Sequence, residues 1–191
     1  GHIDSWDVGD GSTDDGSGCL MAMEAAKILL EADLRPRRTI RVVLFTNEEN
    51  GLRGGKAYHA AHKDEVHAGA IEADSGSASP LGISMAAGDD IVAGLAKYAP
   101  LFEGLGASQI TKGWGGADIS PLMADGVLGM AVRPDGSHYF DLHHSPADTI
   151  DKIDPHDLQR NAGAMALMAW ILAEREELVK VPVPGKEKDD H

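Results

Sequence analysis

A short, wholly apolar run that leads into two adjacent acids limits the folds open to this 191-residue chain. Residues 42–45 are Val-Val-Leu-Phe, and Glu48 and Glu49 follow soon after them. Continuous apolar runs of this length are typical of strands buried on both faces of a parallel sheet, whereas a strand with one wet face alternates. We therefore predict a buried strand over residues 39–46, with the two acids just beyond its carboxyl end.

The rest of the chain alternates apolar strand patterns with helical ones. Further strands are predicted over residues 68–73 and 126–132, and Asp74 follows the first of them. If these strands are parallel, their carboxyl ends lie at one edge of the sheet and bring the acids together. Helical spacing of apolar residues predicts helices over residues 17–32, 54–62, 89–105 with a break at Pro100, and 155–179.

Two of these helices have a predicted core face. In residues 17–32 it consists of Leu20, Met23, Ala26 and Leu30. In residues 155–179 it consists of Leu158, Ala162, Met165, Met168, Ala169 and Leu172. The predicted architecture is an α/β three-layer sandwich, with a largely parallel central sheet flanked by helices. We expect it to lack its N-terminal strands, because no strand precedes His2 to deliver it to the sheet edge. Residues 1–180 are assigned to this partial domain and 181–191 to a flexible, Pro-rich tail.

Charge and cysteine content exclude several classes of function. The formal net charge is −14, which argues against a nucleic-acid partner because phosphates require a basic patch. No polybasic or long apolar segment is present to bind or cross a membrane, so we expect no membrane partner. The single cysteine, Cys19, excludes an internal disulfide, and its apolar surroundings predict a buried, inert thiol.

Two histidines and four acids, most of them beside turn-forming residues, are the chemical signature of the chain: His2, Asp14, Glu48, Glu49, Asp74 and His144. Imidazole nitrogen and carboxylate oxygen suit zinc, and five such ligands serve two metals if one carboxylate bridges them. Asp14 is the best candidate for the bridge. One acid of the Glu48-Glu49 pair can bind metal while the other carries a proton. The set indicates a hydrolase with two Zn²⁺ ions.

Four segments resemble the catalytic domain of the M28 family of di-zinc exopeptidases, and within it the carboxypeptidase Q branch. They are GHIDSWDVGDGSTDDGSG at 1–18, LRPRRTIRVVLFTNEENGLRGG at 34–55, ADSG at 73–76 and HHSPADT at 143–149. The resemblance implies that His2 and Asp74 bind one zinc, and that Glu49 and His144 bind the other. Asp14 would bridge the two ions and Glu48 would be the general acid/base.

The same resemblance implies roles for further residues. Asp4, Asp15 and Asp148 would support the ligands, Asp4 by holding the His2 ring, and the Asp14–Asp15 peptide would be cis. His143 occupies the place of a tyrosine that steadies the oxyanion in some relatives, and a role in orientation or packing is an equal alternative. Asp118, in the glycine-rich segment 113–118, matches a family acid near the site and would line the substrate site; a plain turn is as good an interpretation of that segment.

The implied function is hydrolysis of a terminal peptide bond or of a dipeptide. The resemblance also implies a secreted or periplasmic location, and a homo-oligomer is left open. One alternative is a glutaminyl-cyclase-like acyltransferase of the same fold, which predicts one catalytic zinc. Another is a noncatalytic interaction domain, which is expected to lose ligands, whereas every ligand position named above is present.

Overall fold

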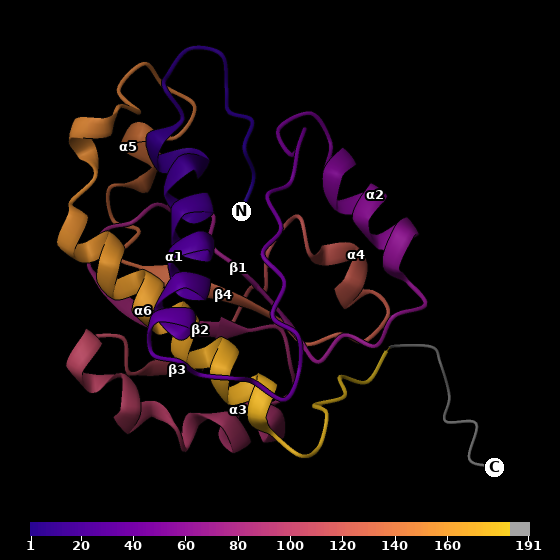
Figure 1. The fold of residues 1–191 in the computed structure, drawn as a ribbon. Coiled ribbons are helices and arrows are strands. Elements are labelled where there is room, and N and C mark those ends of the chain that lie inside the picture. The colour runs from indigo at the N-terminus through magenta and orange to yellow at the C-terminus, as the bar shows by residue number, and fades with distance from the viewer. Residues whose placement is uncertain (184–191) are drawn as a thin grey trace.

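A computed structural model describes residues 1–183, and its centre is a four-stranded sheet (Figure 1). The strands are β1 (Ala70–Glu72), β2 (Pro80–Met85), β3 (Gln109–Lys112) and β4 (Gly129–Pro134). Their order across the sheet is β1-β4-β2-β3. The pairs β1–β4 and β2–β3 are parallel, and β2–β4 is antiparallel. The predicted α/β fold with a largely parallel sheet is confirmed.

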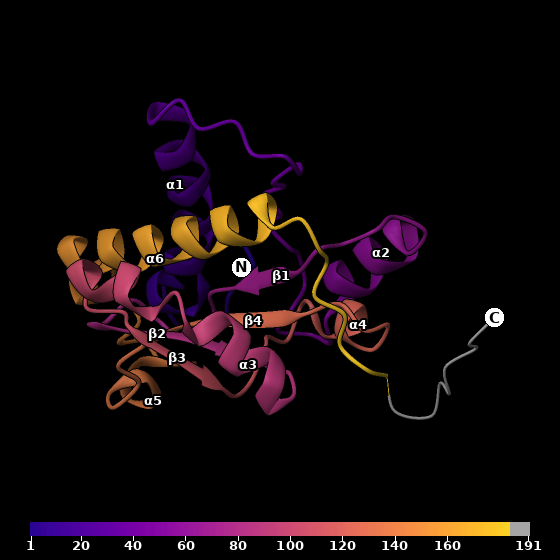
Figure 2. The same ribbon diagram turned by 90° about the horizontal axis from the view of Figure 1, so that it is seen from below.

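Helices cover the sheet on both sides, as Figure 2 shows. They are α1 (Ser17–Glu31), α2 (Arg53–His62), α3 (Asp89–Ala96), α4 (Ser120–Met123), α5 (Tyr139–Leu142) and α6 (Pro155–Glu174). Helices α1 and α6 pack side by side on one face, and α5 lies on the opposite side. Short irregular turns complete the fold, namely η1 (Ser12–Gly16), η2 (Ala99–Leu105) and η3 (Ile150–Lys152). The predicted break at Pro100 is confirmed, because α3 ends before it and a 3₁₀ turn begins.

Helix α6 supplies much of the core. It begins after Asp154, whose Oδ1 accepts hydrogen bonds from the backbone N–H of His156 and Asp157, and Pro155 occupies its first turn. Most of its predicted core face is confirmed, since Ala162, Met165, Met168 and Leu172 are buried. The helix ends at Glu174, short of the predicted residue 179.

The core face predicted for α1 is wrong. Leu20, Met23 and Leu30 are exposed, and the buried residues are instead Met21, Ala25 and Leu29. Apolar residues lie on more than one side of this helix, so their spacing alone does not identify the face that packs. The small side chain of Ala25 in the middle of the buried face suits close packing against α6, with which α1 makes its most extensive contacts.

The strand predicted over residues 39–46 is extended but forms no ladder. Its only pairing with another described residue is one parallel bridge between His2 and Phe45. Val42 is 37% exposed, and the segment lines a cavity of about 610 Å³ together with residues of β1. The prediction of burial on both faces is therefore wrong for residues 1–183, because an extended segment becomes a buried strand only when partners lie beside it. The expected upstream strand stays a prediction.

The other strand predictions are confirmed with changed bounds. Residues 68–73 contain β1, and residues 126–132 overlap β4. Strands β2 and β3 were not predicted, since Pro80 and Gly82 interrupt the pattern of one and the other is only four residues long. In the predicted tail, the Val181 N–H donates to the Gly126 carbonyl at 3.3 Å. Residues 184–191 lie outside the described residues, and the flexible tail stays a prediction.

Candidate metal centre

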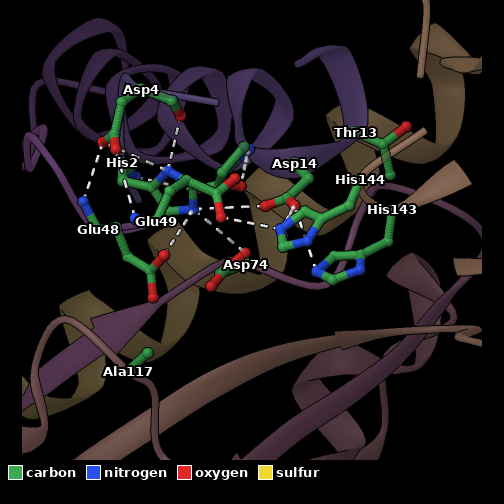
Figure 3. A network of polar contacts seen from close by, with 12 residues as sticks. His2, Asp4, Thr13, Asp14, Glu48, Glu49, Asp74, Ala117, His143 and His144 are labelled. Atoms are coloured by element: carbon green, nitrogen blue, oxygen red, sulfur yellow. Dashed lines mark hydrogen bonds and ion pairs between the residues drawn. The ribbon is translucent and has the colours of Figure 1, made fainter. Parts of the chain in front are cut away.

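The first turn of the chain delivers His2 to the interior. The bridge to Phe45 holds its backbone, and its side chain is 1% exposed. The ring Nδ1 is hydrogen-bonded to the carbonyl oxygen of Asp4 at 2.8 Å, which leaves Nε2 to face the neighbouring carboxylates (Figure 3). A backbone carbonyl therefore orients the ring. The Asp4 carboxylate, which was predicted to do so, lies 3.7 Å from Nδ1.

A kinked turn places Asp14. The peptide between Asp14 and Asp15 is cis, which confirms the prediction. The buried Asp148 carboxylate fastens this turn, because it accepts hydrogen bonds from the N–H groups of Thr13 at 2.5 Å and Asp14 at 3.0 Å. Asp148 thus holds the backbone of Asp14 in position while the side chain of Asp14 stays available.

Asp15 has a different task from its neighbour. Its Oδ2 accepts a hydrogen bond from the His2 N–H at 2.9 Å, and its Oδ1 accepts one from the Gly18 N–H at 3.1 Å. Any side chain at position 18 would collide with the carbonyl of Ala73, so glycine lets α1 begin against the chain that leaves β1. Asp15 therefore ties three segments together with both of its oxygens.

The two adjacent glutamates are held by a tight turn after Phe45. Asn47 has a φ of 60°, a left-handed conformation that asparagine tolerates well. The Asp4 carboxylate accepts hydrogen bonds from the N–H of Glu48 at 3.1 Å and of Glu49 at 3.3 Å. Asp4 thus supports both glutamates through their backbone.

Their side chains then point to different partners. The Oε2 of Glu49 lies 2.8 Å from Nε2 of His144, whereas the Oε2 of Glu48 lies 3.9 Å from Nε2 of His2. Asp74, just past β1, places its Oδ1 3.7 Å from the same His2 nitrogen. The centre therefore has a His2 side and a His144 side.

Asp14 lies between these two sides, as Figure 3 shows. Its Oδ1 is 3.4 Å from Nε2 of His2, and its Oδ2 is 3.3 Å from Nε2 of His144. His143 also reaches Oδ2, at 3.4 Å from its Nε2, and its ring stacks on that of His144 with centroids 3.6 Å apart. All of the predicted ligands are close together, and sets of three lie close enough to hold a metal ion.

The centre has an excess of carboxylate oxygens. Asp14 Oδ2, Glu49 Oε1 and Asp74 Oδ1 are buried and accept no hydrogen bond from any residue of the described range 1–183. Within residues 1–183, no lysine or arginine forms an ion pair with these acids at 4.0 Å or less. Buried carboxylates without donors are costly unless a cation compensates them, and histidine with carboxylate is the donor set that zinc accepts. The residues present therefore fit a zinc site.

The charges of the centre act on one another. Burial alone lowers the pKa of His2, but the neighbouring Asp14 and Asp74 outweigh it and raise that pKa to about 12. Burial raises the pKa of Glu48, and the charge of Asp74 adds to this effect. The carboxylates of the cluster therefore favour a bound positive charge, either a proton or a metal cation.

Asp118 and a residue that sequence reasoning missed form a second buried acidic pair. Asp118 is 1% exposed, and neither of its oxygens has a hydrogen-bond partner in the part of the chain that the structure describes. Burial together with the Glu72 charge raises its pKa to about 7. Glu72 accepts hydrogen bonds from the N–H groups of Ala117 at 2.6 Å and Ile119 at 3.1 Å. It thus ties the glycine-rich loop to β1. The sequence did offer a signal for Glu72, because a charged residue inside an otherwise apolar predicted strand is unusual.

Trp6 is another residue to which the sequence assigned no role. Its ring stacks on that of His144 with centroids 4.6 Å apart and planes within 12°. It stands in the same turn as His2 and Asp4, so three alternate residues of one segment contact the centre.

Fold and site together define a metallopeptidase-like catalytic domain, and comparison with known families agrees. The model of Peptidase family M28 matches residues 1–169, and the chain belongs to this family. Within residues 1–183, no helix combines the length and apolarity that a membrane-spanning segment requires.

The chain is also similar to individual proteins of known sequence or structure. The chain is 36% identical to carboxypeptidase Q of Rattus norvegicus over 181 residues, which are 94% of the chain and 38% of that protein's length. A solved peptidase M28 precursor from Shewanella amazonensis SB2B is 41% identical, with a TM-score of 0.87 over 95% of this chain and 42% of that one. A zinc aminopeptidase from Bacillus subtilis shares the fold at 20% identity, with a TM-score of 0.70 over 94% of this chain and 47% of that one.

Proposed function

We propose that this chain carries the catalytic centre of a di-zinc exopeptidase, which hydrolyses a terminal peptide bond or a dipeptide. The observation that carries the proposal is the position of the Asp14 carboxylate, with one oxygen toward His2 and the other toward His144. A site for a single ion would need only one of these two histidine-facing oxygens, so the arrangement favours two ions. Membership of family M28 and similarity to carboxypeptidase Q support the same class of reaction.

The ligand assignment follows the two sides of the centre. His2 and Asp74 would hold one zinc, Glu49 and His144 the other, and Asp14 would bridge them. When bound, the two ions would acidify a water molecule and polarise the peptide carbonyl.

Glu48 is the proposed proton carrier. It shares the turn of Glu49, but its carboxylate makes no close contact with His144 and is 17% exposed, so it reaches the open part of the site. A carboxylate in this place can accept a proton from the attacking water and return it to the leaving amine. His143 would donate a hydrogen bond to developing negative charge on the substrate oxygen. The equal alternative is a role in orientation or packing, which its ring stacking on His144 also suits.

The proposal is tested on the full-length protein by counting its metals and screening its substrates. Elemental analysis should find two zinc ions for each chain, and activity should be present on dipeptides or on reporters with a free terminus. Removal of the metal by a strong chelator should abolish activity, and zinc should restore it. A single zinc in fully active enzyme would favour the cyclase-like acyltransferase instead. Absence of both zinc and hydrolysis would favour an interaction domain.

A further inference from the structure

The two histidines of the centre are held in different ways. Metal-binding histidines usually have their second ring nitrogen bonded to a carboxylate, carbonyl or water, and this bond fixes the ring orientation. His2 follows the rule through the carbonyl of Asp4 at 2.8 Å. His144 does not: no protein group among residues 1–183 is hydrogen-bonded to its Nδ1, and its side chain is 33% exposed. Among the described residues, contacts other than a hydrogen bond to Nδ1 are therefore the ones that can orient this ring.

Two aromatic contacts are available to do so. The ring of Trp6 lies 4.6 Å from that of His144 with planes 12° apart, and the ring of His143 lies 3.6 Å away with planes 18° apart. Two rings this close and this parallel would overlap each other on one side of an imidazole, so they lie on opposite faces. His144 is therefore the middle of a three-ring stack.

The backbone of His144 increases the need for such support. Its φ is 56°, a left-handed conformation that few residues other than glycine adopt. From this position its Nε2 must stay 2.8 Å from Glu49 Oε2 and 3.3 Å from Asp14 Oδ2. Rotation of this partly exposed ring about its side-chain bonds would lose both contacts.

We propose that Trp6 is a positioning residue of the metal centre, whose indole fixes the His144 ring against Glu49 and Asp14 and thereby strengthens zinc binding on that side. This inference rests on the proposed function. One short segment then serves the whole centre, because His2 would be a ligand, Asp4 supports the glutamate turn and Trp6 orients the opposite histidine. Trp6 also remains 43% exposed, so it reaches the surface beside His144.

The test measures zinc affinity in four variants of the full-length protein by competition with a chelating dye. We expect Trp6→Ala and Trp6→Leu to raise the dissociation constant of one of the two zinc ions by about 2- to 10-fold. This is the range for loss of one stacked aromatic pair. Trp6→Phe should retain near-normal affinity. Trp114→Ala is the matched control, because Trp114 is 64% exposed and forms no ring contact with a proposed ligand in the described part of the chain.

A second readout needs no metal. In the metal-free protein the indole should shift the ring protons of His144 upfield in the NMR spectrum, and Trp6→Ala should remove that shift. Two zinc ions bound as tightly in Trp6→Ala as in the unchanged protein would overturn the inference and leave the proposed function intact. Equal affinities in Trp6→Leu and Trp6→Phe would overturn it too, since simple packing would then suffice. If the unchanged protein bound no zinc, the proposed function would fail together with this inference.

Discussion

At the residue scale, the centre separates groups that face the proposed ions from groups that hold them. Asp14 keeps both side-chain oxygens for the two histidines because Asp148 fastens its backbone. Asp15, its direct neighbour, has both oxygens engaged by backbone N–H groups. Adjacent acids of identical chemistry therefore have different tasks, and the hydrogen bonds decide which is which.

The same distinction between Glu48 and Glu49 is testable. Glu48→Gln keeps the size of the side chain and the proposed ligands, so it should retain both zinc ions while turnover falls roughly 10²–10⁴-fold. Glu49→Gln removes a charged group that lies 2.8 Å from His144, so zinc occupancy should fall with turnover, and excess zinc should restore part of the activity. Metal content and turnover are measured on both variants in parallel. Loss of zinc in Glu48→Gln with full zinc in Glu49→Gln would reverse the assignment.

Asp118 should make the metal-free protein more stable at acidic pH than at alkaline pH. Burial and the charge of Glu72 raise its pKa to about 7, above the value of 3.8 expected in the unfolded chain. Folding therefore takes up a proton between these pH values, and this contribution to stability is lost as the pH rises toward 7.

Asp118→Asn removes the charge, so it should stabilise the metal-free protein by about 2 kcal/mol at pH 8 and by much less near pH 4. Urea unfolding at the two pH values measures the difference. Asp135→Asn is the control, because that acid is exposed and its pKa is lowered by hydrogen bonds from Ser137 rather than raised. A gain for Asp118→Asn that is independent of pH would contradict this account.

At the element scale, helix α6 is fastened at both ends by residues with specific donors or acceptors. Asp154 caps its first turn, and the guanidinium of Arg38 donates to several carbonyls at its other end, those of Leu172, Ala173, Arg175 and Glu176. These carbonyls have no partner inside the helix, and positive charge is favourable there. The contact also anchors the extended segment that leads to Phe45.

Arg38→Met should therefore destabilise the protein by about 2 kcal/mol, as expected for loss of charged hydrogen bonds to a helix end. Arg35→Met is the matched control. Among residues 1–183 its guanidinium pairs only with Asp33, and it is 80% exposed, so the free energy of unfolding should change by less than about 0.5 kcal/mol. Chemical denaturation compares the two variants, and equal effects would show that Arg38 has no special role.

At the scale of the whole molecule, the centre joins segments from most of the chain. Its residues come from the first turn, from η1, from the turns after Phe45 and β1, and from the segment after α5. Because several acids meet there without a lysine or arginine partner among the described residues, bound zinc should stabilise the entire fold rather than one loop.

Zinc should accordingly raise the free energy of unfolding, by about 2.7 kcal/mol per site when free zinc is 100 times its dissociation constant. Chelation should reverse the effect, and magnesium should not replace zinc because it prefers an all-oxygen shell. Thermal and urea unfolding of the full-length protein measure both effects. Asp14→Asn serves as the control, since loss of the bridging carboxylate should reduce the zinc effect at both sites. Equal stability with and without zinc would contradict the proposed site.

The sequence by itself determined which donor atoms the chain offers and roughly where they emerge. The candidate ligands, the helices predicted over 17–32, 54–62 and 155–179, and the break at Pro100 could be predicted because side-chain type, helical spacing and proline act locally. The helices end within one to five residues of the predicted bounds. Tertiary structure alone decided the packing face of α1, the carbonyl that orients His2 and the stacking of Trp6 on His144. It also left residues 39–44 without a strand partner among the described residues. Each of these depends on which segments, distant in the chain, come to lie side by side, and a local pattern does not contain that information.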